Sequence, residues 1–412
     1  MRRLRELLLA LRSSLWIIPG GALVLAVMLG ILLVGVDARL ESDLAERWPR
    51  LFGAGPEGAR GTLEAIAGSM ITVAGVVFSV TIVALSLAAS TYSPRILRTF
   101  MHDRGTQSAF GVFVGAFAYC LVVLRTVRVA DDSGSAFVPS VAVLGALVLA
   151  IAAVCVLVYF IHHVVVAIQV STILSRVADE TSRAIDTLFP EPLGEGEDDS
   201  PQQPPAGLAW QALPARRSGY IVSIDTDRLL AWAAERDFVV RMELGVGEFA
   251  IESLPLASIA GPAPDEEKDG AALDASYSLA DERTIEQDPE FGVQQLVDVA
   301  VRALSPGVND PTTARMCIHH LAGLLVRLAR RREPSRLRTK DGKLRVVTKA
   351  PDFASLCALA FDTLARYAEG KAEVLATLRG AAERVASAAP RSRRARLAVY
   401  LPQERGYRVG VG

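Results

Sequence analysis

The stretch Ser305–Ala314, SPGVNDPTTA, carries small, hydroxylated and acidic residues between two helical patterns. Asp310 precedes Pro311, an arrangement suited to a helix N-cap followed by the first helical position. A helix N-terminus can also bind an anion through its free N–H groups, although Asp310 is placed to occupy them itself. We favour a structural corner between two helices over a binding corner. The candidates for the binding corner are Asp288, Ser305, Asn309, Asp310 and Thr312.

A second pattern lies in the segment 65–91, which contains no charged residue. Thr72, Ser79 and Ser86 recur every seven residues, so their hydroxyls share one face of a helix. Such a face either permits close helix packing, the interpretation we favour for the pattern itself, or lines a water-filled pathway. In the pathway interpretation these three residues line or gate the path, with Arg95 and Arg98 at its inner mouth.

The residue pattern does not indicate an enzyme. The chain has no GxxxxGK[ST] phosphate loop, and no nucleophile stands out with a base and an orienting group. Its four cysteines form no CxxC pair, and the adjacent His319 and His320 would point to different faces of a helix. No acidic residue lies in the middle of an apolar segment, which argues against a proton relay or a cation-coupled transporter. We therefore expect a protein without catalytic residues, cofactor or metal.

The composition is typical of a membrane protein. Hydrophobic residues make up 51% of the 412 residues, and the mean hydropathy is +0.32, which is high for a soluble chain. The net charge of −1 gives the chain no strong attraction to nucleic acid. A helix needs roughly 20 apolar residues to cross a bilayer. Four segments meet this requirement, at about 15–36, 65–91, 109–128 and 137–161.

Positive charges predict how these segments are oriented, because arginine and lysine are enriched in cytoplasmic loops. Arginines cluster before the first segment, at 2–12, and after the second segment, at 95–104. Both clusters favour a cytoplasmic N-terminus. Four crossings then return the chain to the cytoplasm, so the C-terminus is expected there too.

The expected membrane domain, 1–161, is followed by a helical extension and a linker. Helical periodicity continues through 162–189, so we expect the fourth membrane helix to extend into the cytoplasm. Its apolar stripe packs on its own domain, which we favour, or forms a coiled seam with other subunits. The acidic, proline-rich segment 190–217 predicts a disordered linker.

The rest of the chain predicts a cytosolic region with both helices and strands. Residues 218–260 predict a small β-module with glycine turns, as in lipoyl- and biotinyl-type domains, but they contain no lysine for cofactor attachment. Ser253 stands at a turn where glycine is expected. A loop at 261–280, a helical domain with a hairpin at 281–387 and a basic tail at 388–412 follow. The expected fold class is an α-helical polytopic membrane protein, with four transmembrane helices and a C-terminal cytosolic α+β region.

Three stretches carry a resemblance to a known family. They are STYSPRILRTFMHDRGTQSAFGVFVGAFAYCLVVLRTVR, the FIHH end of the fourth segment, and DERTIEQDPEFGVQQLVDVAVRALSPGVNDPTTA. They resemble the bacterial family of predicted membrane proteins called domain of unknown function 2254, over nearly the whole chain. The resemblance implies an integral protein of the cytoplasmic (inner) membrane. It implies no established activity and no catalytic residues.

Together these patterns lead to two functional hypotheses. The first is a homo-oligomeric, channel-like conduit with a cytosolic regulatory domain, which follows from the hydroxyl face and the missing intramembrane carboxylates. The second is a membrane-anchored sensor or scaffold, whose cytosolic region binds a partner or a small anion. The expected neighbours are the lipid bilayer and further copies of the chain, not nucleic acid.

Overall fold

A computed structural model describes most of the chain: residues 17–39, 55–91, 103–128, 137–190 and 207–397. The chain divides into two compact units, Met1–Gln169 and Val170–Gly412. Each unit has its own hydrophobic core.

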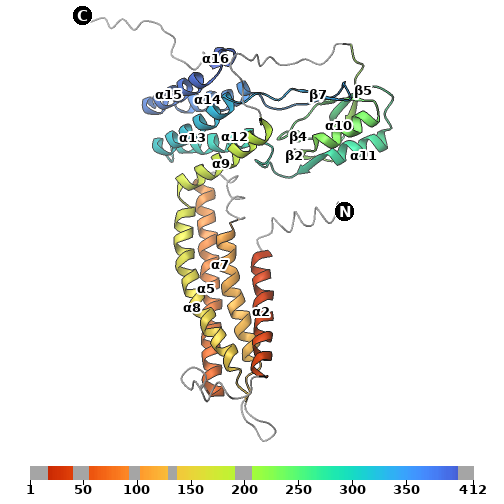
Figure 1. Cartoon of the computed structure of the whole chain (residues 1–412). Helices are drawn as coiled ribbons and strands as arrows, with labels where there is room; N and C mark the ends of the chain where they lie inside the picture. The colour runs from red at the N-terminus through yellow and green to blue at the C-terminus, as the bar shows by residue number, and fades with distance from the viewer. Residues whose placement is uncertain (1–16, 40–54, 92–102, 129–136, 191–206, 398–412) are drawn as a thin grey trace, which may run out of the picture. The chain divides into compact units, whose positions relative to one another are not determined.

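The first unit is, in its described residues, a bundle of four helices (Figure 1). They are α2 (Ile17–Asp37), α5 (Pro56–Thr91), α7 (Arg104–Leu124) and α8 (Ser140–Ala167). All four are long and apolar enough to cross a membrane, as the sequence predicted. α5 begins at Pro56 instead of at residue 65. Its 36 residues span about 54 Å at 1.5 Å per residue, so its polar first turns can extend beyond the hydrocarbon core of a bilayer.

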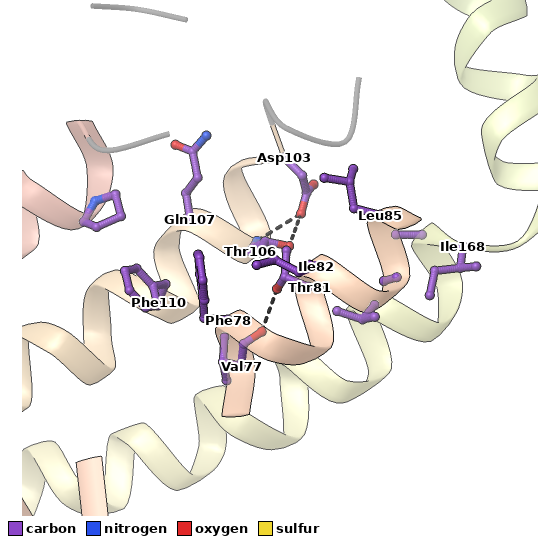
Figure 2. Close-up of a pocket in the computed structure, with 14 residues that line it drawn as sticks. Val77, Phe78, Thr81, Ile82, Leu85, Asp103, Thr106, Gln107, Phe110 and Ile168 are labelled. Carbon is purple, nitrogen blue, oxygen red and sulfur yellow. Dashed lines mark hydrogen bonds between the residues drawn. The ribbon is translucent and has the colours of Figure 1, made fainter. Parts of the chain in front are cut away.

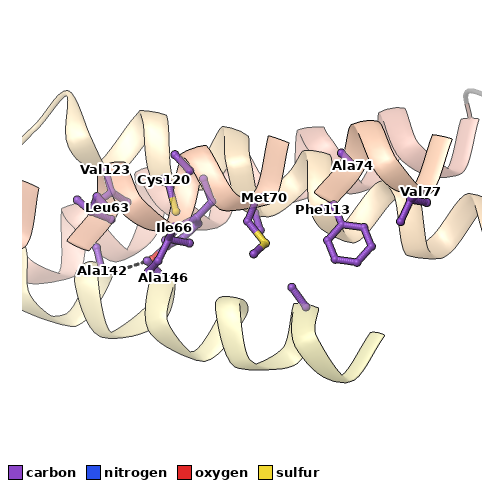
Figure 3. Packing of buried hydrophobic residues seen from close by; sticks show 14 of the residues in the cluster. Leu63, Ile66, Met70, Ala74, Val77, Phe113, Cys120, Val123, Ala142 and Ala146 are labelled. Atoms are coloured by element: carbon purple, nitrogen blue, oxygen red, sulfur yellow. Dashed lines mark hydrogen bonds between the residues drawn. The ribbon is translucent and has the colours of Figure 1, made fainter. Parts of the chain in front are cut away.

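The interior of the bundle is apolar and closely packed around α7 (Figure 3). Phe113 of α7 and Leu63 of α5 are among its fully buried side chains. Gly111 lets α2 approach α7, since a Cβ there would lie only 3.2 Å from the Cα of Pro19. The Tyr119 hydroxyl donates a hydrogen bond to the carbonyl oxygen of Ala142 (2.8 Å). The described core therefore offers no polar passage through one copy of the bundle.

A carboxylate at the end of α2 fixes the start of α8. The two side-chain oxygens of Asp37 accept hydrogen bonds from the backbone N–H groups of Val141 and Ala142, each at 2.9 Å. These N–H groups lie in the first turn of α8, where they have no partner within the helix. The same carboxylate also lies at the positive end of the α8 dipole. Asp37 thus joins two helices that are distant in sequence.

The fourth membrane helix does not continue through residue 189 as the sequence predicted. α8 ends at Ala167, and α9 (Val170–Leu188) starts after a break at Ile168 and Gln169. α9 belongs to the second unit and packs on α12 (Pro289–Leu304) and α13 (Pro311–Ala329). Its polar and apolar faces are well separated, whereas α8 is apolar all round, so the two helices suit different surroundings.

The apolar stripe of α9 is buried within its own unit, which confirms the packing interpretation over a seam between subunits. The buried positions include Leu174, Val177 and Ile185. Thr181 lies against Gly292 of α12, where a Cβ would come within 1.9 Å of the threonine Oγ1. Glycine is therefore required at 292 for this close crossing of two helices.

The second unit contains two sheets in its described part. A five-stranded sheet has the order β1 (Gln211–Pro214), β5 (Pro255–Ala260), β3 (Val239–Met242), β8 (Lys343–Val347) and β7 (Leu337–Lys340). A three-stranded sheet has the order β4 (Phe249–Ala250), β2 (Gly219–Ile224) and β6 (Tyr277–Ala280). The helices α10 (Thr226–Glu235) and α11 (Glu266–Ser276) lie between strands in the sequence. Among these strands all pairings are antiparallel except that of β3 with β8. An isolated parallel bridge also joins Ala215 to Glu252.

The structure differs from the predicted boundaries in this unit. β1 lies in the stretch assigned to the linker, and the expected loop at 261–280 forms α11 and β6. The predicted hairpin exists, but β8 pairs with β3, so it completes the sheet instead of belonging to a helical domain. This mixed sheet is not the barrel-sandwich arrangement suggested by the glycine turns. Ser253 adopts a φ of 69°, which explains why a glycine was expected there.

The remaining helices are α14 (Phe353–Tyr367), α15 (Ala372–Ala388) and α16 (Arg391–Leu397). α16 lies in the stretch predicted as a basic tail, and its Arg393 is buried. The Arg393 guanidinium donates to the carbonyl oxygens of Leu328 (3.1 Å), Ala329 (3.3 Å) and Arg331 (2.9 Å). These carbonyls lie at or just beyond the C-terminal end of α13, and that of Leu328 also accepts from the Arg331 N–H (3.0 Å), so Arg393 adds charged hydrogen bonds to the end of the helix.

Candidate functional site

The hydroxyl face of α5 points away from the core of its own bundle. Thr72, Ser79 and Ser86 are all exposed, whereas Ala74 and Val77 are buried. At 100° per residue, Ser79 lies 200° around the helix from Val77, so the two residues occupy opposite faces. These hydroxyls therefore do not contribute to helix packing within one copy of the bundle.

Two glycines on this outward face of α5 leave the helix backbone uncovered by side chains. A Cβ added at Gly68 or Gly75 would have no neighbour within 4 Å. The Thr72 hydroxyl donates to the Gly68 carbonyl oxygen (2.8 Å), so its proton is already used within the helix. Its oxygen still has acceptor capacity toward the outside. The predicted mouth residues Arg95 and Arg98 lie outside the described residues.

A cavity of about 150 Å³ lies beside the same helix, on the flank between the core and the outward face (Figure 2). Its walls come from α5, α7, the end of α8 and Pro19 of α2. Phe78 and Phe110, with ring centroids 6.1 Å apart, are part of the mainly apolar lining. Asp103 and Thr106 supply polar groups. The cavity could hold a few methylene groups or a small ring.

A carboxylate–histidine pair is held at this end of the bundle. Asp103 caps α7, accepting hydrogen bonds from the backbone N–H (2.9 Å) and the hydroxyl (2.8 Å) of Thr106. The Nε2 atom of His163 on α8 lies 2.6 Å from Oδ2 of Asp103. A Cβ at Gly105 would lie 2.6 Å from the same Nε2, so glycine permits this approach. Burial raises the pKa of Asp103, but the hydrogen bonds from Thr106 and His163 outweigh it and leave a net lowering.

The Asp103–His163 pair was not found from the sequence. Asp103 precedes a helix as N-caps do, and His163 ends an apolar segment, but their separation of 60 residues hides the pairing. Only the antiparallel packing of α7 and α8 brings the two side chains together.

In the second unit, SPGVNDPTTA forms a tightly bonded corner between α12 and α13. The Ser305 hydroxyl donates to the carbonyl oxygen of Arg302 (2.6 Å), and Asn309 adopts a φ of 46°. Asp310 caps α13, accepting from the backbone N–H (3.0 Å) and the hydroxyl (2.5 Å) of Thr313. These hydrogen bonds lower the pKa of Asp310. Because Asp310 occupies the helix N-terminus, an anion would have to displace it.

The five corner candidates are not brought together. Ser305, Asn309, Asp310 and Thr312 lie at the C-terminal end of α12, whereas Asp288 caps its N-terminus. The 16 residues of α12 separate these ends by about 24 Å. The prediction that Asp288 lies in the same corner as the other four residues is therefore wrong.

Asp288 is part of a separate buried ion pair. Its Oδ2 lies 2.8 Å from the Arg283 guanidinium, and its Oδ1 accepts from the N–H of Phe291 (3.0 Å). Burial raises the pKa of Asp288, and Arg283 opposes this rise. A Cβ at Gly247 would lie 2.4 Å from Oδ2, so this glycine closes the pair on one side. The arrangement leaves little room for a ligand.

The described residues contain no group of three or more His, Cys, Asp or Glu side chains placed to hold a metal. Cys317 and Cys357 are buried, and burial raises the pKa of both thiols. A thiol becomes reactive as a thiolate, so these two are poorly suited to nucleophilic chemistry.

The described fold combines four helices that are long and apolar enough to cross a membrane with a second unit of helices and small sheets. Residues 12–384 match the model of a family described as "Predicted membrane protein (DUF2254)". The chain is 33% identical over 385 residues to an uncharacterized protein of Mycobacterium tuberculosis, and the match covers 92% of this chain and 73% of the relative. The same figures hold for an uncharacterized protein of Mycobacterium bovis. No solved structure matches the chain.

The chain therefore belongs to this family of predicted membrane proteins, as the resemblance in its sequence implied. The descriptions of the family and of these relatives name no activity.

Proposed function

We propose that this protein forms a homo-oligomeric, channel-like conduit, with the outward face of α5 from each copy lining the pathway. The observation that carries the proposal is the orientation of Thr72, Ser79 and Ser86, which point away from the apolar core of their own bundle. Since that core is closed to water, a polar route has to run between copies.

The chemistry of the outward face supports this assembly. Small residues such as Gly68 and Gly75 allow the backbones of two helices to approach closely in a membrane. The Thr72 oxygen, whose proton is bonded within the helix, can accept a hydrogen bond from water or contact a permeating ion. Phe78, on the flank, is half exposed and could close the seam between copies.

Cysteine chemistry at Ser79 tests the proposal. In a Cys155→Ala background, a Ser79→Cys variant should cross-link between copies in native membranes and react with a water-soluble, membrane-impermeant thiol reagent. Val154→Cys on α8 is the matched control, because Val154 is also exposed on the bundle but lies on a uniformly apolar helix. If the Ser79→Cys and Val154→Cys variants behaved alike in both assays, the α5 face would be an ordinary lipid-facing surface.

We also propose that the bundle lies in the bacterial cytoplasmic membrane with both termini in the cytoplasm. The arginines at 2–12 and 95–104 support this orientation. Reporter fusions at each terminus test it, using one reporter active only in the cytoplasm and one active only outside it. A C-terminal fusion active only outside would contradict the orientation.

A second candidate function is a membrane-anchored sensor or scaffold. It is favoured by the cavity, whose lining includes Ala167 and Ile168 at the end of α8. α9 and the second unit begin two residues later, so a ligand in the cavity would contact the connection between the units. An apolar photoaffinity probe that labels the cavity, in a protein without flux, would favour this function over the conduit.

A further inference from the structure

The second unit carries an exposed apolar tip, which we define as Phe249, Ile251 and Leu254. Their exposed fractions are 48%, 50% and 52%. In this unit, Val308 and Tyr367 are the other large hydrophobic residues described as exposed. Most of the exposed bulky apolar surface described in the unit is thus gathered within six residues.

The turn that presents the tip is ordered by its own hydrogen bonds. Ser253 adopts a φ of 69°, which reverses the chain between the tip residues Ile251 and Leu254. The Ser253 N–H donates to the Ala215 carbonyl oxygen (2.9 Å), and the Ala215 N–H donates to the Leu254 carbonyl oxygen (2.8 Å). Phe249 packs edge-on against Tyr220 at 4.9 Å between ring centroids. The exposed side chains are therefore displayed on a preformed support.

Two exposed arginines lie directly beside this turn. Arg216 and Arg217 follow Ala215, the residue bonded to both Ser253 and Leu254. The Ser218 hydroxyl then accepts a hydrogen bond from the Glu252 N–H (3.0 Å), so the arginine segment is fastened to the turn at both ends. Glu252 adds one exposed acid, so Arg216, Arg217 and Glu252 together carry a net positive charge. The Arg216 side chain extends toward Gly270 of α11, where its Nε would lie 3.6 Å from an added Cβ, so Arg217 is the arginine that this helix leaves free to contact lipid.

We propose that the apolar tip, with Arg216 and Arg217, binds the surface of the membrane that holds the protein. Phe, Ile and Leu side chains insert at the boundary between headgroups and acyl chains, while arginines contact the phosphates of anionic lipids. The short connection from α8 to α9 keeps the second unit at that membrane, which raises the effective concentration of lipid at the tip. The inference rests on membrane anchoring and not on the conduit.

Charge favours lipid over a second copy of this chain as the occupant. A symmetric contact between two tips would bring the arginines of both copies together, while each copy has one acid, Glu252, in the turn itself. A symmetric interface places the same patch on both sides, so this repulsion could not be avoided by sliding one copy. An anionic lipid surface, by contrast, is complementary to both arginines.

Depth-dependent quenching on the full-length chain tests the proposal. A polarity-sensitive fluorophore is attached to Leu254→Cys in a Cys155→Ala background, and the protein is placed in nanodiscs of phosphatidylcholine and phosphatidylglycerol. Ile251→Cys serves as a second labelling site in case the first variant folds poorly. Tyr367→Cys is the matched control, because Tyr367 is 53% exposed and lies outside the tip. Folding of each variant is checked by the protection of the buried Cys317 thiol.

A lipid carrying a spin label near its headgroup should quench the fluorophore at 254 several-fold more strongly than the one at 367, and aqueous iodide should show the opposite order. Changing Arg216 and Arg217 together to alanine, or using phosphatidylcholine alone, should reduce the lipid-borne quenching. Equal quenching at 254 and 367 would overturn the proposal. Protection of position 254 from both quenchers would also overturn it, by showing that a protein covers the tip.

Discussion

Replacing Ser79 with leucine tests whether the hydroxyl face of α5 points away from its own bundle or packs inside it. Ser79 is exposed, whereas Ala74, five residues earlier on the same helix, is only 2% exposed. Five residues turn a helix by 500°, so the two side chains point 140° apart. The same added bulk should therefore have different consequences at the two positions.

The expected magnitudes follow from this geometry. Ala74→Leu forces a larger side chain into a closed core, at a cost of about 1–3 kcal/mol in the free energy of unfolding. For a unit of this size, about 1 kcal/mol shifts Tm by roughly 2–4 °C, so a fall of about 2–12 °C is expected. Ser79→Leu meets no side chain in its own copy and should change stability by less than about 0.5 kcal/mol.

Thermal unfolding of the purified protein, in a detergent in which it is monomeric so that contacts between copies do not contribute, measures both variants beside the wild type. A fall in Tm for Ser79→Leu as large as that for Ala74→Leu would refute the outward orientation. The hydroxyl face would then be a packing surface within one copy, and the proposed conduit would lose its main support.

Three further predictions concern the second unit. Arg393→Ala should lower the free energy of unfolding by roughly 1.5–3 kcal/mol, because it removes charged hydrogen bonds to the end of α13. Faster labelling of the buried Cys317 thiol reports this loss, and Arg391→Ala, which changes an exposed arginine of the same helix, should have little effect. Asp310→Ala should lower the free energy of unfolding by about 1 kcal/mol, because α13 loses its N-cap, and the same labelling assay measures it. A loss of flux without this destabilisation would contradict a purely structural role for Asp310. The third concerns Asp186, whose pKa is lowered chiefly by the hydrogen bond from Arg327. Its stabilising contribution should be complete above the unfolded pKa near 3.8 and be lost as the pH falls through the lower folded value. Asp186→Asn should weaken this dependence, and an unchanged acid-unfolding curve would show that the pair contributes nothing.

The membrane helices could be predicted because long apolar segments have few other uses. Both ends of α7 and the start of α8 lie within five residues of the predicted bounds. The αα-corner was also predicted, because Pro311 and Asp310 carry strong local preferences. The end of α8 was missed, since the periodicity of α9 continues across Ile168 and Gln169 almost in phase. What changes there is the packing partner, from the apolar helix bundle to the core of the second unit, and periodicity alone does not report that.

The sheets and the site depend on contacts between distant segments. β8 pairs with β3, which lies about a hundred residues earlier, and the sequence of neither strand predicts this pairing. The pairing of Asp103 with His163 has the same origin. For α5 the hydroxyl face was visible in the sequence, but its direction was not, because Ser79 and Ala74 are both small. Only the position of the neighbouring helices shows which of them faces the core.

The measurement that tests the central claim most directly is solute and ion flux through liposomes holding the purified full-length protein, with the oligomeric mass determined on the same sample. The account predicts an oligomer that conducts, and a loss of flux in Ser79→Leu without a loss of folded protein. An equal flux from Ser79→Leu and the wild type, or a folded monomer that conducts nothing under voltage, tension and varied pH, would contradict it.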